Sequence, residues 1–214
     1  CTVQAKAPGV KNQWAKFGLS LSSSGGEGTT PRLFDTGNPG SESTCVDAVL
    51  GSPNQACTPS GPGEGSAGAQ GLTGENCEPL GNVLIIQEPG ASCPDDNKDG
   101  GVIIFDFFSP AQYVFDMGFL DIDEASKVEV IHETEAGLTP TVFNLPLTGN
   151  NGKQTLDINI ENVSQIIVTL SRSGAVTFID FCYDPESIST APPAAPTPPA
   201  NTASPTASPT GSPT

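Results

Sequence analysis

The sequence predicts an all-β fold, an antiparallel β-sandwich of the jelly-roll type. Apolar residues alternate with polar ones at a period of two in many short runs, which is typical of strands with one buried face. Clusters of Gly, Pro, Asn, Asp and Ser separate these runs at a spacing of roughly ten residues. Helical periodicity is absent over any useful length. Short strands joined by regular turns favour a sandwich over a helical or mixed fold.

The strands follow from these runs in chain order. The run 83–86 is short and continuously apolar, whereas 128–133 follows a period of two, and Gly118 is expected to bend the chain between two further runs. The predicted strands are 14–21, 32–34, 83–86, 102–108, 113–115, 119–122, 128–133, 141–145, 156–160, 166–170 and 176–182.

The 214 residues divide into one domain and one tail. Residues 1–185 contain all the strands, together with an irregular Gly/Ser/Cys-rich loop over about 35–81 that cannot bury a core of its own. Residues 186–214 are rich in Pro, Thr, Ser and Ala, which favours an extended, solvated chain. We expect either a glycosylated stalk or a bare linker there.

The six cysteines indicate disulfides and an extracellular or cell-surface location, because none forms a C-x-x-C pair. The chain starts at Cys1 rather than at methionine, as expected of a processed protein or a fragment. Six cysteines allow fifteen connectivities of three bridges each, and we predict one of them. It pairs cysteines that are close in the sequence and joins the two ends of the domain, which are expected to be neighbours. The predicted bridges are Cys45–Cys57, Cys77–Cys93 and Cys1–Cys182.

A formal net charge of −16, from 24 acidic and 8 basic residues, disfavours nucleic acid and anionic lipid as partners. No apolar run reaches the roughly 20 residues of a membrane helix. Calcium and cationic surfaces suit such a chain, although acidic surfaces also serve solubility alone.

Asp95, Asn97 and Asp99 alternate before Gly100, as in the opening of a calcium loop, and Asp106 stands at the position of its closing ligand. The flanking segments are predicted strands, which excludes an EF-hand, and a plain turn explains the same residues. A second, weaker set of oxygen ligands could converge at one end of the sandwich. It comprises Asp35, Asn38, Asp121, Asp123 and Glu124.

Several short segments resemble a secreted domain found in bacterial surface proteins of the PEP-CTERM type and in microalgal extracellular proteins. The resemblance covers roughly 32–183 and rests on the runs 33–39, 81–88, 100–107 and 120–124. It implies a galactose-binding-like jelly roll on a cell surface, and it implies no particular reaction.

Catalysis finds little support in the sequence. His132 is the single histidine, it lies on an alternating run among glutamates, and no nucleophile motif accompanies it. The aromatic rings suited to a sugar platform are Trp14, Tyr113 and Tyr183, of which Trp14 alternates with apolar neighbours and is expected in the core. The many carboxylates do not exclude a glycoside hydrolase, but they do not favour one either.

These observations predict a non-enzymatic extracellular glycoprotein, a structural or adhesive subunit of a surface coat or filament. A calcium-dependent carbohydrate-binding module is the alternative, and a secreted hydrolase is a distant third. The expected partners are copies of the chain itself, with each tail lying in a groove of the next subunit, and glycans. Expected glycosylation sites are the sequon residue Asn162 and the tail residues Thr197, Thr202, Ser204, Thr206, Ser208, Thr210 and Ser212.

Overall fold

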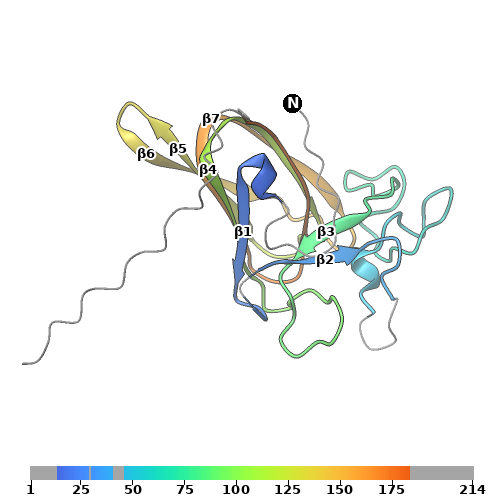
Figure 1. Ribbon diagram of the computed structural model, residues 1–214. Coiled ribbons are helices and arrows are strands. Elements are labelled where there is room, and N and C mark those ends of the chain that lie inside the picture. The colour runs from blue at the N-terminus through green and yellow to red at the C-terminus, as the bar shows by residue number, and fades with distance from the viewer. Residues whose placement is uncertain (1–13, 29, 41–45, 184–214) are drawn as a thin grey trace, which may run out of the picture.

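The computed structural model describes residues 14–28, 30–40 and 46–183, and within them the predicted β-sandwich is confirmed. Eight strands and two single-turn 3-10 helices make up its regular structure (Figure 1). In order they are η1 (Ala15–Phe17), β1 (Leu19–Ser24), β2 (Arg32–Asp35), η2 (Ala48–Leu50), β3 (Asn82–Ile85), β4 (Gly101–Leu120), β5 (Ser126–Thr134), β6 (Gly137–Leu145), β7 (Lys153–Leu170) and β8 (Ala175–Cys182).

All pairings between these strands are antiparallel. They lie in the order β2-β3-β8-β4-β7-β5-β6, and β1 pairs with β4 outside this path. The first half of β4 pairs with β1 and with the end of β7, whereas its second half pairs with β8 and with the start of β7. The long strands β4 and β7 therefore contribute to both halves of the sandwich, and the curved ribbons of Figure 1 follow from this.

Two strands are longer than the sequence indicates, because bulges bend the chain where turns are expected. In β4 the ladder shifts between Asp106 and Ala111, so the residues between them bulge out without ending the strand. In β7 the backbone φ angles of Asn159 and Asn162 are +53° and +54°, and asparagine tolerates this left-handed conformation. The three strands predicted at 102–108, 113–115 and 119–122 form the single strand β4, which ends at Leu120, and those predicted at 156–160 and 166–170 form the single strand β7.

The core lies between the two halves of the sandwich. β1 buries alternate residues, as do the first part of β4 and the end of β7. Trp14 is buried in this core, as expected, although it precedes η1 rather than belonging to a strand. A smaller apolar cluster joins Phe34, Val83 and Ile85 to the fully buried Leu50 of η2. Leu50 thereby anchors the start of the long loop to the sheet.

The predicted disulfide pairing is wrong. Cys57 is bonded to Cys77, with their Cα atoms 5.4 Å apart, so the expected Cys45–Cys57 and Cys77–Cys93 bridges do not form. The loop folds back on itself here, because Asn54 N–H donates to Asn76 O at 2.7 Å and brings the two cysteines together. Cys93 is also disulfide-bonded, and its partner lies outside the described residues.

Cys182 is a free thiol at the end of β8, which contradicts the expected Cys1–Cys182 bridge. That expectation rested on adjacent first and last strands. In the structure β8 lies between β3 and β4, and β1 pairs with β4 alone among the described strands.

Two other expectations concern glycosylation and membranes. Asn162 is exposed, but it lies inside β7, with a left-handed backbone, rather than in a turn between strands. The tail sites from Thr197 to Ser212 lie outside the described residues, as does Cys1. Within the described part of the chain, no helix has the length and apolar character needed to cross a membrane.

Candidate metal centre

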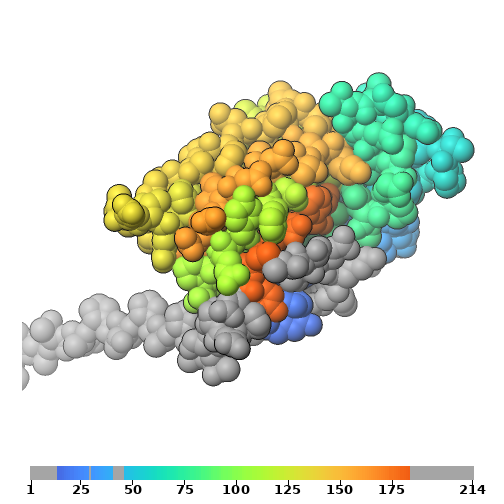
Figure 2. Space-filling view, turned by 90° about the horizontal axis from the view of Figure 1, so that it is seen from above, coloured from blue at the N-terminus to red at the C-terminus, as the bar shows by residue number. Residues whose placement is uncertain are grey.

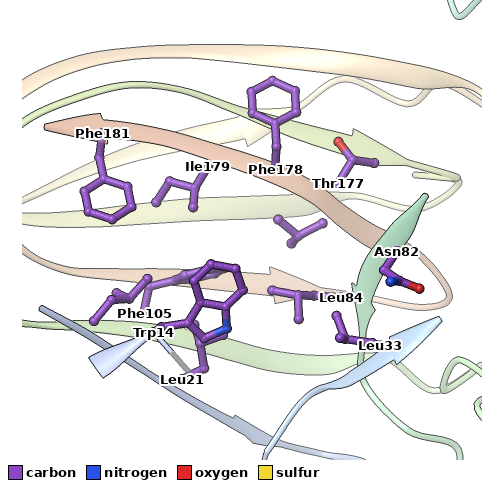
Figure 3. Close-up of a pocket in the computed structure, with 12 residues that line it drawn as sticks. Trp14, Leu21, Leu33, Asn82, Leu84, Phe105, Thr177, Phe178, Ile179 and Phe181 are labelled. Atoms are coloured by element: carbon purple, nitrogen blue, oxygen red, sulfur yellow. The ribbon is translucent and has the colours of Figure 1, made fainter. Parts of the chain in front are cut away.

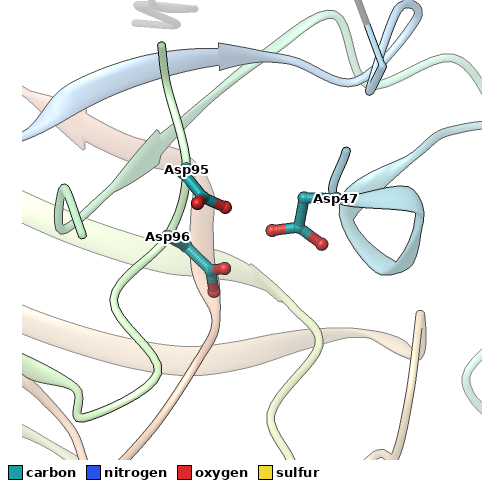
Figure 4. A group of neighbouring side chains, drawn as sticks. All are labelled: Asp47, Asp95 and Asp96. Atoms are coloured by element: carbon teal, nitrogen blue, oxygen red, sulfur yellow. The ribbon is translucent and has the colours of Figure 1, made fainter. Parts of the chain in front are cut away.

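Three aspartates from two distant parts of the chain meet near the end of the sandwich from which the long loop extends. Asp47 comes directly before η2, and Asp95 and Asp96 are neighbours in the loop between β3 and β4. One carboxylate oxygen from each lies within 4.8 Å of one from each of the others. In Figure 4 the Asp47 carboxylate points toward the other two. We call these three residues the aspartate group.

Backbone hydrogen bonds hold each member in place. Asp47 N–H donates to Pro39 O at 2.9 Å, and Asp47 O accepts from Leu50 N at 3.2 Å. The β3–β4 loop extends the antiparallel pattern of β3 for a few residues, because Glu88 N–H donates to Asp95 O at 2.8 Å and Gln87 forms a bridge with Asp96. Both sides of the group are therefore tied to the sheet.

The turn between β7 and β8 supports Asp96 from a third direction. Gly174 N–H donates to Asp96 Oδ2 at 2.7 Å, and the Ser173 hydroxyl is hydrogen-bonded to the same oxygen. Ser173 Oγ also lies 3.4 Å from Asp121 Oδ2. A hydroxyl carries one hydrogen, so it can donate to one of these carboxylates at a time.

Asp121 connects the aspartate group to the long loop through Asn151. Asn151 N–H donates to Asp121 Oδ1 at 2.7 Å. The Asn151 side chain accepts from Asn54 Nδ2 at 2.7 Å and Asn76 Nδ2 at 3.1 Å, and it donates to Val49 O and Gly51 O, both at 2.7 Å. A single fully buried amide thus holds several segments of the loop against the sandwich.

Charge burial in this region is largely uncompensated. Asp47 is 8 % exposed, and its Oδ2 atom is buried with no hydrogen-bond partner. Burial raises the pKa of Asp47 to about 9, helped by a hydrogen bond with Asp96 and by the charges of Asp96, Asp121 and Asp95. Burial likewise raises the pKa of Asp121 to about 7, against the hydrogen bond from Asn151 N–H.

Burial and the charges of Asp96 and Glu88 also raise the pKa of Asp95. Lys98 opposes this rise and is the weakest of the four influences; its ammonium forms an ion pair with Glu88. The aspartate group thus combines one buried and two half-buried carboxylates with little positive charge nearby. Such a group can hold shared protons or a hard cation.

The structure separates the residues of the predicted calcium loop. Asp95 belongs to the aspartate group, but Asn97 is a turn residue whose side-chain amide donates to Gly25 O and Gly100 O. Asn97 Oδ1 accepts from Asp99 N–H at 3.2 Å, and Asp99 is exposed. Asp106 lies within β4 and accepts a hydrogen bond from Gln165 of β7. The alternating pattern is therefore largely the signature of a turn.

The second predicted set also separates. Asp35 caps its own turn by accepting from Gly37 N–H at 3.0 Å, and Asn38 is exposed in that turn. Asp121 adjoins the aspartate group through Ser173, whereas the pKa of Asp123 is raised by burial and by neighbouring Glu124. Sequence reasoning missed Asp47, Asp96 and Asn151. The Asp95-Asp96 doublet was the available signal, and nothing local marks Asp47.

No family model matches this chain, and no curated protein matches it. Two solved structures have weak overall similarity to it. The enzymatically active domain of bacteriophage CBA120 tailspike protein 4 is 11 % identical, with a TM-score of 0.36 over 82 % of this chain. CpGH89CBM32-4 from Clostridium perfringens is 16 % identical, with a TM-score of 0.27 over 56 % of this chain and 93 % of that one. The chain spans about a fifth (21 %) of the tailspike structure. Neither similarity bears on function.

Two hollows among the described residues have linings that do not include the aspartate group. One is mostly apolar and narrow, with Trp14, Leu84 and Phe181 among its lining residues (Figure 3). Its wall includes Thr177, whose hydroxyl is buried without a partner. Another, of about 380 Å³, lies over 146–148 and 153–155. His132 lies near neither hollow's lining and contacts Thr141 Oγ1 at 3.1 Å through Nε2.

Proposed function

We propose that this chain is a non-enzymatic, extracellular structural or adhesive protein whose copies associate through the β5–β6 hairpin. The observation that carries the proposal is a row of exposed apolar residues on an open sheet edge. β6 pairs with β5 and with no other described strand, so its outer backbone groups face solvent. An open edge of this kind is a template for pairing with another chain.

The row consists of Leu138, Pro140 and Val142, three alternating exposed residues on one face of β6. Leu138 is 64 % exposed and Val142 is 53 % exposed. Ile131 stands opposite Pro140 on β5 and widens the apolar surface. Clustered exposed apolar side chains on a soluble domain commonly mark an interaction site.

The position of the hairpin suits contact between copies. Figures 1 and 2 show β5 and β6, in yellow, projecting at one end of the domain, with the long loop at the other end. Contacts that join different surfaces of successive copies generate filaments rather than closed dimers. Disulfides in the loop and an acidic composition support an extracellular setting.

Light scattering on the full chain over a range of concentrations tests this proposal. We expect concentration-dependent association, and we expect the double variant Leu138→Ser/Val142→Ser to remain monomeric. Leu147→Ser is the matched control, because Leu147 is 62 % exposed but lies after β6. A monomeric wild type contradicts the proposal. If the hairpin variant still associates while a chain ending at Pro185 does not, the tail carries the contact instead.

One observation favours carbohydrate binding as a second candidate. The rings of Tyr113 and Phe115 on β4 lie 4.6 Å apart, and Phe115 is 36 % exposed. Tyr113 Oη lies 3.4 Å from Asn159 Oδ1, which places a polar group beside the rings. Aromatic faces with polar anchors bind sugars. A glycan array with and without chelator, repeated with Phe115→Ala, tests this candidate, and unchanged binding by the variant rules out this platform.

A further inference from the structure

We propose that the aspartate group of Asp47, Asp95 and Asp96 binds one calcium ion. This site is independent of the proposed contact between copies, which uses the opposite end of the domain. It also differs from the alternating Asp95, Asn97 and Asp99 pattern visible in the sequence, because two of its three ligands, Asp47 and Asp96, do not belong to that pattern.

The spacing of the oxygens suits a single ion. Calcium binds oxygen ligands at about 2.3–2.6 Å, so two ligands of one ion lie at most about 5 Å apart. The oxygens of Asp47, Asp95 and Asp96 lie within 4.8 Å of one another, which is inside that limit.

Unpartnered buried oxygen atoms provide independent support. Asp47 is more than nine-tenths buried, its Oδ2 has no hydrogen-bond partner, and its carboxylate points toward Asp95 and Asp96 (Figure 4). Gln87 is 2 % exposed, and its Oε1 also has no partner. Because Gln87 and Asp96 form an antiparallel bridge, their side chains lie on the same side of the local ladder. Leaving such acceptors unpaired is costly, and a cation removes the cost.

The donor set favours calcium over other divalent ions. Zinc prefers histidine nitrogen and cysteine sulfur, and the aspartate group offers oxygen alone. Magnesium requires a near-ideal octahedron and retains several waters, whereas calcium accepts irregular sets of six to eight oxygens. Two adjacent aspartates and a third from another segment form an irregular set of this kind.

Binding would join parts of the chain that are distant in sequence. Asp47 lies in the long loop directly before η2, and Asp95 and Asp96 belong to the β3–β4 loop. Asp96 is also held by the β7–β8 turn through Ser173 and Gly174. An ion between them would fasten the start of the long loop to the sandwich. We therefore assign the ion a stabilising role, without activation of water.

Calorimetric titration of the chelator-treated full chain with calcium chloride tests the proposal, alongside melting curves with and without the ion. We expect one ion per chain and a melting temperature raised by several degrees at millimolar calcium, because a ligand that binds the native state alone stabilises it. Asp47→Asn and Asp96→Asn are each expected to weaken calcium binding at least tenfold and to abolish the melting shift. Both replacements keep the side-chain shape, so the variants should fold, as circular dichroism will show.

Asp99→Asn is the matched control. Asp99 is exposed and belongs to the sequence pattern but not to the aspartate group, so this variant should respond to calcium as the wild type does. The proposal is overturned if the wild type shows no calcium-dependent shift, or if Asp47→Asn retains wild-type affinity. It is also overturned if Asp99→Asn loses binding while Asp47→Asn keeps it, since that result restores the linear calcium loop. Magnesium chloride at the same concentration should produce a smaller shift, and an equal shift would contradict selectivity for calcium.

Discussion

Asn151 donates its backbone N–H to Asp121 Oδ1 at 2.7 Å, and both residues have a φ of +64°. This contact joins the turn before β7 to the residue that follows β4. The Asn151 side chain continues the connection into the long loop by bonding to Asn54, Asn76, Val49 and Gly51. The loop is thus held by a buried polar network in addition to its disulfide.

Replacing Asn151 should therefore be among the most damaging single changes. Asn151→Ala leaves two buried amide donors and two carbonyl acceptors without this partner. It also places alanine, whose side chain cannot form local hydrogen bonds, at a φ of +64°. We expect a loss of about 3–5 kcal/mol in the free energy of unfolding, measured by urea titration. Exposed Asn150→Ala is the control, with an expected change below about 0.5 kcal/mol. Similar effects of the two variants would show that the network contributes little.

Removing the Cys57–Cys77 bridge should also destabilise the protein. The two residues are 20 apart in sequence, and a loop of about that size gains roughly 3 kcal/mol from cross-linking. We expect Cys57→Ala/Cys77→Ala to lose about this amount. Cys182→Ser, which changes a free thiol, should have little effect. Non-reducing peptide mapping checks the pairing directly, and a Cys77–Cys93 peptide would contradict the structure.

Metal-free protein should lose stability as the pH rises. The pKa of Asp47 is raised to about 9 and that of Asp121 to about 7, so the native state binds more protons than the unfolded state above about pH 4. The stabilisation that these two raised pKa values give to the native state is fully present below about pH 4. It is lost for Asp121 as the pH approaches 7 and for Asp47 as it approaches 9, with a slope near 1.4 kcal/mol per pH unit for each proton.

Urea titrations in chelator at pH 5, 7 and 8.5 measure this dependence. Asp47→Asn removes one of the two groups, so its stability relative to wild type should increase steadily over that range. The groups facing Asp47 are Asp96, Asp121 and Asp95, all of which are acidic and act in the same direction. A difference between variant and wild type that does not change with pH would show that Asp47 is ionised in the native state.

Three aspartates lie side by side across β7, β4 and β8, and removing one of their charges should change the stability of the protein. Asp116 on β4 stands opposite both Asp157 on β7 and Asp180 on β8. Burial raises the pKa of Asp116, as do the charges of Asp180 and Asp157. Like charges directly across strands are destabilising, so Asp116→Asn should raise stability by about 0.2–1 kcal/mol at pH 7 in chelator. The gain should shrink as the pH falls, because protonation of Asp116 removes the same charge. A loss of stability at pH 7 would indicate that a cation lies among the three aspartates.

The β-sandwich was predictable because a strand with one buried face must alternate apolar and polar residues. That pattern identified the position of nearly every strand and the burial of Trp14. It could not distinguish a turn from a bulge inside β4 or β7, since the same residue types occur in both. Which strands become neighbours depends on where bulges bend them.

The sequence by itself determined the strand segments, the acidic charge and the presence of cysteines suited to disulfides. The tertiary structure alone decided which of those cysteines and carboxylates meet. Cys57 joined Cys77 because the loop folds back on itself through Asn54 and Asn76, and Asp47 reached Asp95 and Asp96 because Leu50 is buried beside β3. Such contacts depend on the burial of apolar residues elsewhere in the chain, so no local pattern of acids or cysteines records them.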